Sequence, residues 1–480
     1  MSELTPSASA PATGRIVGVL AFAGIVAAIM QTLVVPLLGN LPEMLNTTAS
    51  NATWVVTATL LTAAVATPTA GRLGDMFGKR RILLLCTVPL IIGSVVCALS
   101  SGLLPMIVGR GLQGLGMGVV PLGISLMRDV VPAEKLGSSV AVMSASLGVG
   151  GALGLPFAAI VAQNTSWRVL FWVAAGLSVV VAILVSSLVP AGRKAETSSR
   201  FDLVGAIGIG IALVALLLGI SKGSDWGWGS ATTLVMLIGS VAVLLAWGWW
   251  ELRTKDPLVD LRVTARPQVL LTNVASILIG FSMYAQSLVI PQLLQLPAAT
   301  GYGLGQSMIQ MGLWMAPAGL MMMLVAPVGA KLSAAKGPKV TLIVGGLVIA
   351  VGYAISMPLL GSTLGLLVVT LICGTGTGFA YGSMPALIMG AVPLSETASA
   401  NSFNTLMRSI GTSFAAAVIG VLLAQMTTDF GGTSLPSEAG FRTVLLIGAG
   451  VALLAAAVTS LIPARQQASV TAPQRAGAGV

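Results

Sequence analysis

The chain has 480 residues, of which 56% are hydrophobic and 8% are charged, and it contains no histidine. Soluble domains carry about 25% charged residues, so this composition excludes a soluble protein and indicates a chain that crosses a membrane many times. A net charge of +10 suggests nucleic-acid binding in a soluble protein. Here the excess of basic residues follows from membrane topology, because cytoplasmic loops of membrane proteins are rich in Lys and Arg.

The hydrophobic stretches predict the membrane-spanning segments. A helix needs about 20 apolar residues to cross about 30 Å of hydrocarbon. Fourteen stretches meet this requirement and predict an all-α polytopic membrane protein. In chain order they cover residues 16–38, 53–71, 82–100, 103–127, 136–162, 169–190, 204–221, 232–250, 268–293, 306–330, 339–359, 364–388, 400–426 and 442–462.

The basic residues are distributed unevenly between the loops. With a cytoplasmic amino terminus, nineteen Lys and Arg fall in cytoplasmic loops or tails and three, Arg168, Lys222 and Arg442, in outer loops. The nineteen include Arg193, Lys194, Arg465 and Arg475. Because positive loops stay in the cytoplasm, we predict a multi-pass protein of the bacterial inner membrane with both termini cytoplasmic.

Four sequence elements of the first half return in the same order in the second half. Gln31 to Pro36 returns as Gln286 to Pro291, Gly114 to Gly118 as Gly374 to Gly378, Val131-Pro132 as Val392-Pro393, and Arg168 as Arg442. Four matches in one order predict a duplication into two six-helix halves that begin on the same membrane side. Such halves place a binding site between them and can rock against each other, which predicts a transporter.

The seventh and eighth spans have no counterpart in this repeat. We therefore predict an N-terminal six-helix half over residues 1–195, a two-helix insertion over 196–255 and a C-terminal six-helix half over 256–480.

Away from their ends, the apolar segments carry two charges, Arg110 and Arg408. A charge within a membrane is costly and by default indicates a functional residue. The alternatives are that Arg110 extends to the outer interface and that Arg408 bonds carbonyl groups between helices. The sequence offers no catalytic constellation and no metal-ligand spacing, so we expect neither enzyme activity nor a metal or cofactor.

The residues between the second and third spans form a recognisable motif, Gly71-Arg-Leu-Gly-Asp75-Met-Phe-Gly78-Lys79-Arg80-Arg81. It resembles the cytoplasmic G-x-L-x-D-x-x-G-[RK]-[RK] signature of the major facilitator superfamily. The resemblance implies a conformational latch of Gly71, Asp75, Gly78, Lys79 and Arg80, in which the aspartate contacts the opposite half and helps to lock the outward-facing state. Since a helix N-terminus favours a carboxylate, we expect Asp75 to meet the start of span 13 near Ser399 to Asn401. The alternative is an ordinary basic loop with turn glycines.

Span 4 contains Arg110-Gly-Leu-Gln113-Gly114-Leu-Gly116. This run resembles the R-x-x-Q-G-x-G element of proton-coupled members of the superfamily, which implies that Arg110 and Gln113 take part in coupling to a proton gradient. The carboxylates that could titrate are Asp75, Glu43 and Asp129. The closely spaced glycines also predict a smooth face against which another helix packs.

Span 13 carries Asn401, Asn404 and Arg408 at spacings that place them on one helical stripe. The run Asn404-x-x-x-Arg408-x-x-Gly411 resembles a pattern of the 14-helix drug:proton antiporters, the bacterial multidrug efflux type. The spans that line the cavity in this superfamily give the following candidates for substrate contact: Gln31, Thr32, Tyr284, Gln286, Trp314, Tyr381, Asn404 and Arg408.

Two departures from that branch affect the predicted mechanism. An acid expected in span 1 is replaced by Met30-Gln31, and the Gly-Pro pair of span 5 is split into Gly154-Leu-Pro156. The main prediction is a monomeric proton-driven exporter of lipophilic or amphipathic small molecules that works by alternating access and binds no nucleic acid. One alternative is a dedicated carrier of a neutral or anionic metabolite, which two embedded cations favour. The other is a non-transporting membrane sensor or assembly partner.

Overall fold

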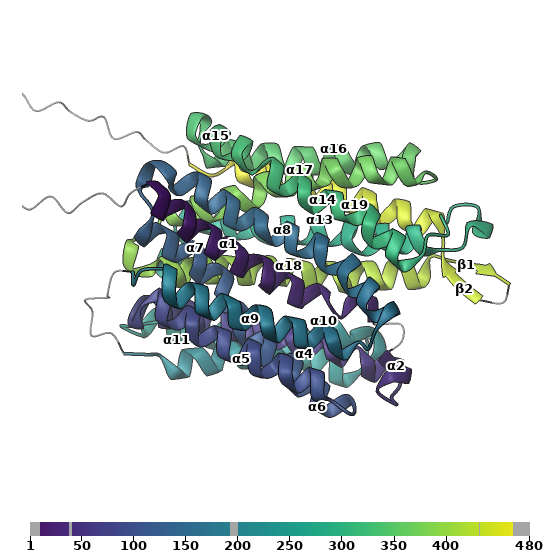
Figure 1. The fold of residues 1–480 in the computed structure, drawn as a ribbon, viewed down its shortest axis with the longest axis horizontal. Coiled ribbons are helices and arrows are strands. Elements are labelled where there is room, and N and C mark those ends of the chain that lie inside the picture. Colours follow the sequence, from purple (N-terminus) through teal and green to yellow (C-terminus); the bar gives the residue numbers. More distant parts are fainter. Residues whose placement is uncertain (1–9, 38–40, 193–199, 432, 464–480) are drawn as a thin grey trace, which may run out of the picture.

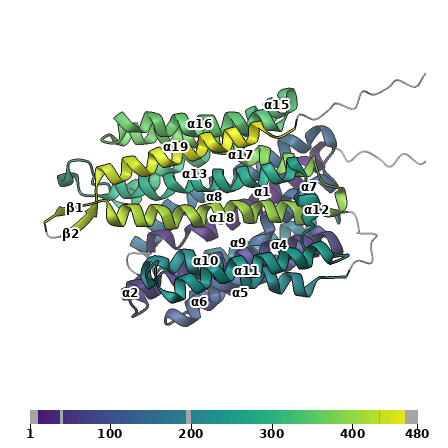
Figure 2. The same ribbon diagram turned by 180° about the vertical axis from the view of Figure 1, so that it is seen from behind.

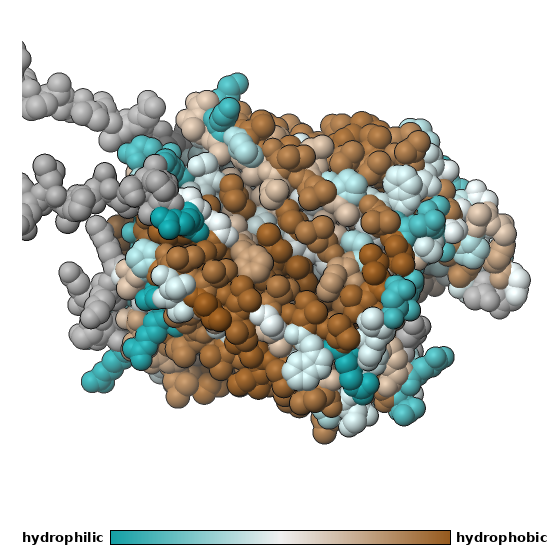
Figure 3. Space-filling view, in the orientation of Figure 1, coloured by the Kyte–Doolittle hydropathy of each residue, from teal (hydrophilic) through white to brown (hydrophobic). Residues whose placement is uncertain are grey.

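The computed structural model describes residues 10–37, 41–192, 200–431 and 433–463. Within them lie 14 helices long and apolar enough to cross a membrane, which confirms the predicted number and the all-α class. The helices run along the length of the molecule (Figure 1). Hydrophobic side chains cover its middle, and hydrophilic ones gather toward its two ends (Figure 3). A belt of this kind is what a membrane-embedded bundle requires.

The described elements follow in chain order. The first half contains α1 (Ala10–Thr32), η1 (Val35–Leu37), α2 (Leu41–Met44), α3 (Ala49–Ala52), α4 (Trp54–Phe77), α5 (Lys79–Leu99), α6 (Leu103–Leu115), η2 (Gly116–Gly118), α7 (Val119–Val130), α8 (Ala133–Asn164) and α9 (Arg168–Leu188). The insertion contains α10 (Leu203–Trp226) and α11 (Ala231–Arg253). The second half contains α12 (Leu261–Thr264), α13 (Pro267–Gln295), η3 (Ala298–Thr300), α14 (Met308–Leu324), α15 (Ala326–Lys336), α16 (Pro338–Leu359), α17 (Thr363–Met389), η4 (Leu394–Glu396), α18 (Thr397–Gln425), β1 (Thr427–Phe430), β2 (Thr433–Pro436) and α19 (Glu438–Ser460).

Polar side chains begin several of these helices. The side chains of Asp202, Ser230, Ser307, Ser362 and Ser437 each accept a backbone N–H of the first helical turn. These caps satisfy donors that a helix start leaves without a partner. Strands β1 and β2 form an antiparallel hairpin, with Thr427 opposite Pro436.

The segment between the second and third spans differs from the prediction. The expectation of a loop at residues 72–81 was wrong, because α4 continues to Phe77 and α5 starts at Lys79. The break is confined to Gly78, whose φ of 99° suits glycine and strains other residues. Asp75 therefore sits on the last turn of a helix, which fixes its direction.

The hydrophobic core has three main parts. One lies mainly within α1 and α4–α9 and also includes Met389 and Ala398 of the second half, and another lies mainly within α13–α19 and also includes Ala141 and Ala145 of α8. A third joins α10 and α11 to Leu61 of α4 and Phe403 of α18. The insertion thus packs against one helix from each half through α10, and Figure 2 shows α10 running beside α18. The domain division at residues 195 and 255 stays a prediction; Arg193, Lys194, Arg465 and Arg475 lie outside the described residues.

The repeated glycines have matching roles in the two halves. Gly114 packs against Thr59 and Thr62 of α4, and Gly116 packs against Cys86 and Leu90 of α5. In the second half, Gly374 packs against Ala318 of α14, and Gly376 against Gly345 and Ile349 of α16. A side chain at any of these glycines would collide with the neighbouring helix, so the predicted smooth face is confirmed.

Candidate functional site

The carboxylate of Asp75 joins the two halves. Its Oδ1 accepts the backbone N–H of Ala398 at 3.1 Å, and its Oδ2 accepts that of Ser399 at 2.8 Å. Both donors lie in the first turn of α18, where unpaired N–H groups and the helix dipole favour a negative charge. The contact predicted from the motif is confirmed, one residue earlier than expected. We call this end of the bundle the Asp75 end and the opposite one the hairpin end.

Further hydrogen bonds cross between the halves at the Asp75 end. Arg128 Nη1 donates to Thr397 Oγ1 at 2.7 Å and to the carbonyl of Val392 at 3.3 Å. Ser125 Oγ donates to the carbonyl of Thr397 at 3.1 Å, and Asn401 Nδ2 reaches Ser125 Oγ at 3.4 Å. Helix α7 therefore holds the start of α18 together with α4. The motif did not reveal Arg128, although its position at the end of span 4 was available in the sequence.

The basic residues of the motif contact their own half. Lys79 Nζ lies 3.0 Å from Asp129 Oδ1 and 4.0 Å from Asp75 Oδ1, and all three side chains are buried. Lys79 thereby compensates two carboxylates that would otherwise repel each other. Arg80 donates to the carbonyls of Val185 and Ser186 at the end of α9. Arg80 thus caps a helix within the first half rather than contacting the second.

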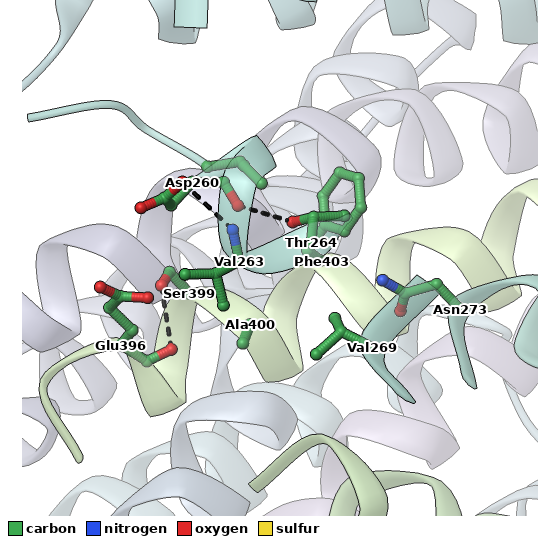
Figure 4. Close-up of a pocket in the computed structure, with 10 residues that line it drawn as sticks. Asp260, Val263, Thr264, Val269, Asn273, Glu396, Ser399, Ala400 and Phe403 are labelled. Atoms are coloured by element: carbon green, nitrogen blue, oxygen red, sulfur yellow. Dashed lines mark hydrogen bonds between the residues drawn. The ribbon is translucent and has the colours of Figure 1, made fainter. Parts of the chain in front are cut away.

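Helices α4 and α18 approach closely behind the carboxylate. A Cβ added at Gly71 would collide with the Ser402 side chain and lie 2.7 Å from the carbonyl oxygen of Ala398. Beside this crossing, α12, α13 and α18 enclose a small pocket of about 10 Å³. Asn273, Glu396 and Phe403 face it (Figure 4). It has room for one water-sized group, so it is no substrate cavity.

Arg110 is 1% exposed and lies inside the first half. Its Nε donates to the carbonyl of Val55 at 3.1 Å, and its Nη1 donates to the carbonyl of Met30 at 2.9 Å and to Gln113 Oε1 at 2.7 Å. Gln113 in turn donates to Ser94 Oγ at 2.8 Å. Among the described residues no carboxylate lies within 4.0 Å of this guanidinium. Arg110 and Gln113 therefore hold α1, α4, α5 and α6 together, and their predicted coupling role lacks an acidic partner here.

Arg408 has different surroundings. Its guanidinium carbon lies 4.3 Å from the ring centroid of Tyr381 on α17. The side chain is half-buried and makes neither a hydrogen bond nor an ion pair with the described residues. Gly280 of α13 allows this position, because a Cβ there would lie 3.1 Å from Arg408 Cγ. Two predicted substrate contacts are thus neighbours, and the donors of Arg408 can bind a further group.

Asn404 lies on the same stripe but faces another helix. Its Nδ2 donates to Asn273 Oδ1 and to Ser276 Oγ, both at 2.8 Å and both on α13. Its side chain is 2% exposed. Through these bonds Asn404 holds α13 against α18 in this conformation.

The remaining candidates are scattered. Gln31 is exposed and its Nε2 reaches Met117 Sδ at 3.5 Å, whereas Thr32 bonds carbonyls of its own helix. Gln286 is buried and Tyr284 half-buried. Trp314 Nε1 donates to Gln306 Oε1 at 3.2 Å. Glu43 is exposed on α2, which precedes α4, whereas Asp75 lies on the last turn of α4.

The sequence pattern missed two buried charges in the insertion. Lys222 was expected in an outer loop, but α10 continues to Trp226 and includes it. Lys222 Nζ donates to Thr53 Oγ1 at 2.5 Å and to Asp225 Oδ2 at 3.0 Å. The other buried charge is Glu251, which α11 includes because it ends at Arg253. Hydropathy marks where an apolar run ends, but each of these helices continues about one turn beyond that run. The sequence pattern therefore gave no sign that the two residues belong to helices.

The insertion also borders an open groove. Residues of α10 and α18, together with Trp228 after α10, line a volume of about 420 Å³. Ser221 and Trp228 lie on one side, and Gly420 and Gln425 lie on the other. Since Gln425 ends α18 just before strand β1, this groove is near the hairpin end.

Residues 20–416 match the Major Facilitator Superfamily. The chain belongs to this family. The membership agrees with the 14 helices among the described residues that are long and apolar enough to span a membrane.

This chain is similar in sequence to several bacterial proteins. An uncharacterised MFS-type transporter of Mycobacterium tuberculosis is 29% identical over 431 residues, which cover 88% of this chain and 61% of the relative. This chain thus spans less than two thirds of that protein. The tetracenomycin C resistance and export protein of Streptomyces glaucescens is 27% identical, with 80% of this chain and 71% of the relative covered. The probable multidrug resistance protein EmrY of Escherichia coli is 29% identical, with 68% and 63% covered.

Two solved structures share the fold. The human organic anion transporter MFSD10 aligns with a TM-score of 0.66 at 15% identity, over 93% of this chain and 99% of that chain. The proton:xylose symporter XylE aligns with a TM-score of 0.64 at 15% identity, over 95% and 97%. At this identity the two structures support the architecture alone.

Proposed function

We propose that this transporter exports lipophilic or amphipathic small molecules across the bacterial inner membrane, driven by a proton gradient and working as a monomer. In the proposed topology both termini and the Asp75 end are cytoplasmic. The names of the relatives from Streptomyces and Escherichia support a drug-type substrate. No metal or other cofactor is part of the proposal.

The contact between Asp75 and the start of α18 is the observation that supports a mechanism of alternating access. It joins the halves through hydrogen bonds that can separate without unfolding either helix. A contact of this kind contributes about 0.3–1 kcal/mol, which biases a near-balanced equilibrium without freezing it. The described conformation is the one closed at the Asp75 end. Asp75 and Asp129, which share Lys79, are the carboxylates that we propose to titrate during transport.

One observation favours a second candidate, a carrier of an anionic metabolite. Arg408 presents a guanidinium whose donors bond no described residue, and Tyr381 holds it in place. Guanidinium groups bind carboxylates and phosphates well because two parallel N–H groups match two oxygens. No acid lies in the corresponding position of span 1, where Met30-Gln31 stands.

An efflux assay separates these functions. Cells that express the chain are loaded with cationic, neutral and anionic dyes, and efflux is measured with and without an uncoupler. Uncoupler-sensitive efflux of chemically varied lipophilic dyes supports the exporter. Movement of small anions alone supports the metabolite carrier, and efflux that the uncoupler leaves unchanged contradicts proton coupling.

A further inference from the structure

The insertion contains a buried pair of carboxyl groups at the Asp75 end. Glu251 on the last turn of α11 is 1% exposed, and Asp202, which begins α10, is 8% exposed. A Cβ added at Gly205 would lie 2.5 Å from Glu251 Oε1 and still closer to Asp202 Oδ2. The two carboxyl oxygens are therefore less than twice that distance apart. Two ionised carboxylates that close repel each other strongly in a buried site.

The two groups differ in their hydrogen bonds. Asp202 accepts the backbone N–H of Gly205 at 2.8 Å and the indole Nε1–H of Trp250 at 3.1 Å, as an ionised carboxylate should. Both oxygens of Glu251 are buried and accept no hydrogen bond from the described residues. An ionised group without donors is costly to bury, so Glu251 is the member that carries a proton in this conformation.

Donors nevertheless surround Glu251. The backbone N–H groups of Leu258 and Val259 and the Nε1–H of Trp247 face its carboxyl group. None reaches an oxygen in hydrogen-bonding geometry, and Trp247 Nε1 is itself buried without a partner. Three donors are thus poised around an acceptor that does not use them.

Among the described residues, Asp202 is the titratable side chain that faces Glu251. Arg253 is turned away, with its guanidinium carbon 4.0 Å from the ring centroid of Trp249. Arg262 Nη2 donates to the carbonyl of Leu252 at 2.6 Å. Beyond the pair lies a hydrophobic cluster that includes Leu61 of α4 and Phe403 of α18.

We propose that Glu251 and Asp202 form a proton-binding site that controls the linker over residues 254–260, between α11 and α12. When Glu251 is protonated, Leu258 and Val259 pack into the apolar core shared with α4 and α18. When its O–H bond breaks, the electron pair stays on the carboxylate and the proton passes to water at the Asp75 end. The two carboxylates then repel each other, water enters to solvate them, and the linker leaves its apolar site.

The consequence for transport rests on the proposed function. Helices α4 and α18 carry Asp75 and Ser399 and close the Asp75 end. A loosened linker therefore weakens the packing of the insertion against these two helices. Protons on that side would thus regulate the rate, in addition to those that drive transport.

Hydrogen–deuterium exchange of residues 254–260 tests the site without any transport measurement. The full chain is placed in nanodiscs, and exchange is corrected for the intrinsic effect of pH. From about pH 5 to about pH 8 we expect exchange of this linker to rise about tenfold, as Glu251 ionises. Glu251→Gln, which mimics the protonated group, should keep exchange slow throughout. Asp202→Asn keeps the helix cap and removes the repelling charge, so the rise should move to lower pH.

The matched control is Glu134→Gln, an exposed acid at the same end, which should behave like the unmodified chain. Linker exchange that does not change with pH, or a rise that persists in Glu251→Gln, overturns the proposal. In a transport assay, Glu251→Gln should weaken the dependence of the rate on pH at the Asp75 end, and the dependence that comes from the driving protons should remain. Absence of proton-driven transport in the unmodified chain would contradict the proposed function, and the exchange result would still decide the site.

Discussion

Arg110 and Arg408 are both embedded arginines on helices that carry sequence motifs, one in each half, yet their surroundings differ. Arg110 is enclosed and donates to two backbone carbonyls and a glutamine. Arg408 lies over Tyr381, and its donors bond no described residue. An embedded cation whose donors are used holds helices together, whereas one with donors to spare can bind a substrate. We therefore expect Arg110 to hold helices together and Arg408 to bind substrate.

The largest effect is expected at Arg110. Arg110→Met should sharply reduce the folded yield, because it leaves the carbonyls of Met30 and Val55 and the side chain of Gln113 without their donor. Hydrogen bonds to a charged group contribute about 1.5–3 kcal/mol each, so the loss should reach several kcal/mol. Thermal unfolding in detergent and size-exclusion profiles measure it. A variant that unfolds like the unmodified chain but has lost transport would show that Arg110 is functional instead.

Arg408→Met is the matched substitution in the other half. We expect it to abolish transport while folded yield and unfolding temperature stay near those of the unmodified chain, since no hydrogen bond is lost. Transport in proteoliposomes is the measurement, and Arg408→Lys, which retains the charge, should keep part of the activity. Loss of folded protein in Arg408→Met would instead show that Arg408, like Arg110, stabilises the fold.

Asp75→Asn should have an intermediate effect. It removes the negative charge from the start of α18 and from Lys79, which costs about 1 kcal/mol and shifts the balance about fivefold toward conformations open at the Asp75 end. Spin labels on Ser138 of α8 and Lys331 of α15, both exposed, report that opening. An unchanged distance distribution between the labels would contradict the latch.

The smallest effect is expected at Tyr381. Tyr381→Phe retains the aromatic face, so transport should change less than about twofold. Tyr381→Leu removes a cation–π contact of about 0.5–1 kcal/mol and should lower transport further. Initial rates with the same substrate compare the two variants. Equal loss in both would mean that the hydroxyl group, and not the ring, matters.

The sequence predicted the features that depend on local patterns. Hydropathy gave 14 spans, and the motif placed Asp75 within one residue of its partner on α18. It could not separate Arg110 from Arg408, because the carbonyls that enclose Arg110 come from α1 and α4, far away in the chain. It also missed Glu251 and Lys222, since a charged residue that ends an apolar run can belong to the helix or to the loop.

The difference between the two arginines can be measured most directly by chemical accessibility. The buried cysteines Cys86, Cys97 and Cys373 are replaced by serine, and a single cysteine is introduced at Arg408 or at Ser94, which bonds Gln113 beside Arg110. A membrane-impermeant maleimide should label position 408, and position 94 should stay unreactive. Equal reactivity at the two positions, or no reaction at 408, would contradict the assignment of Arg408 to the substrate path.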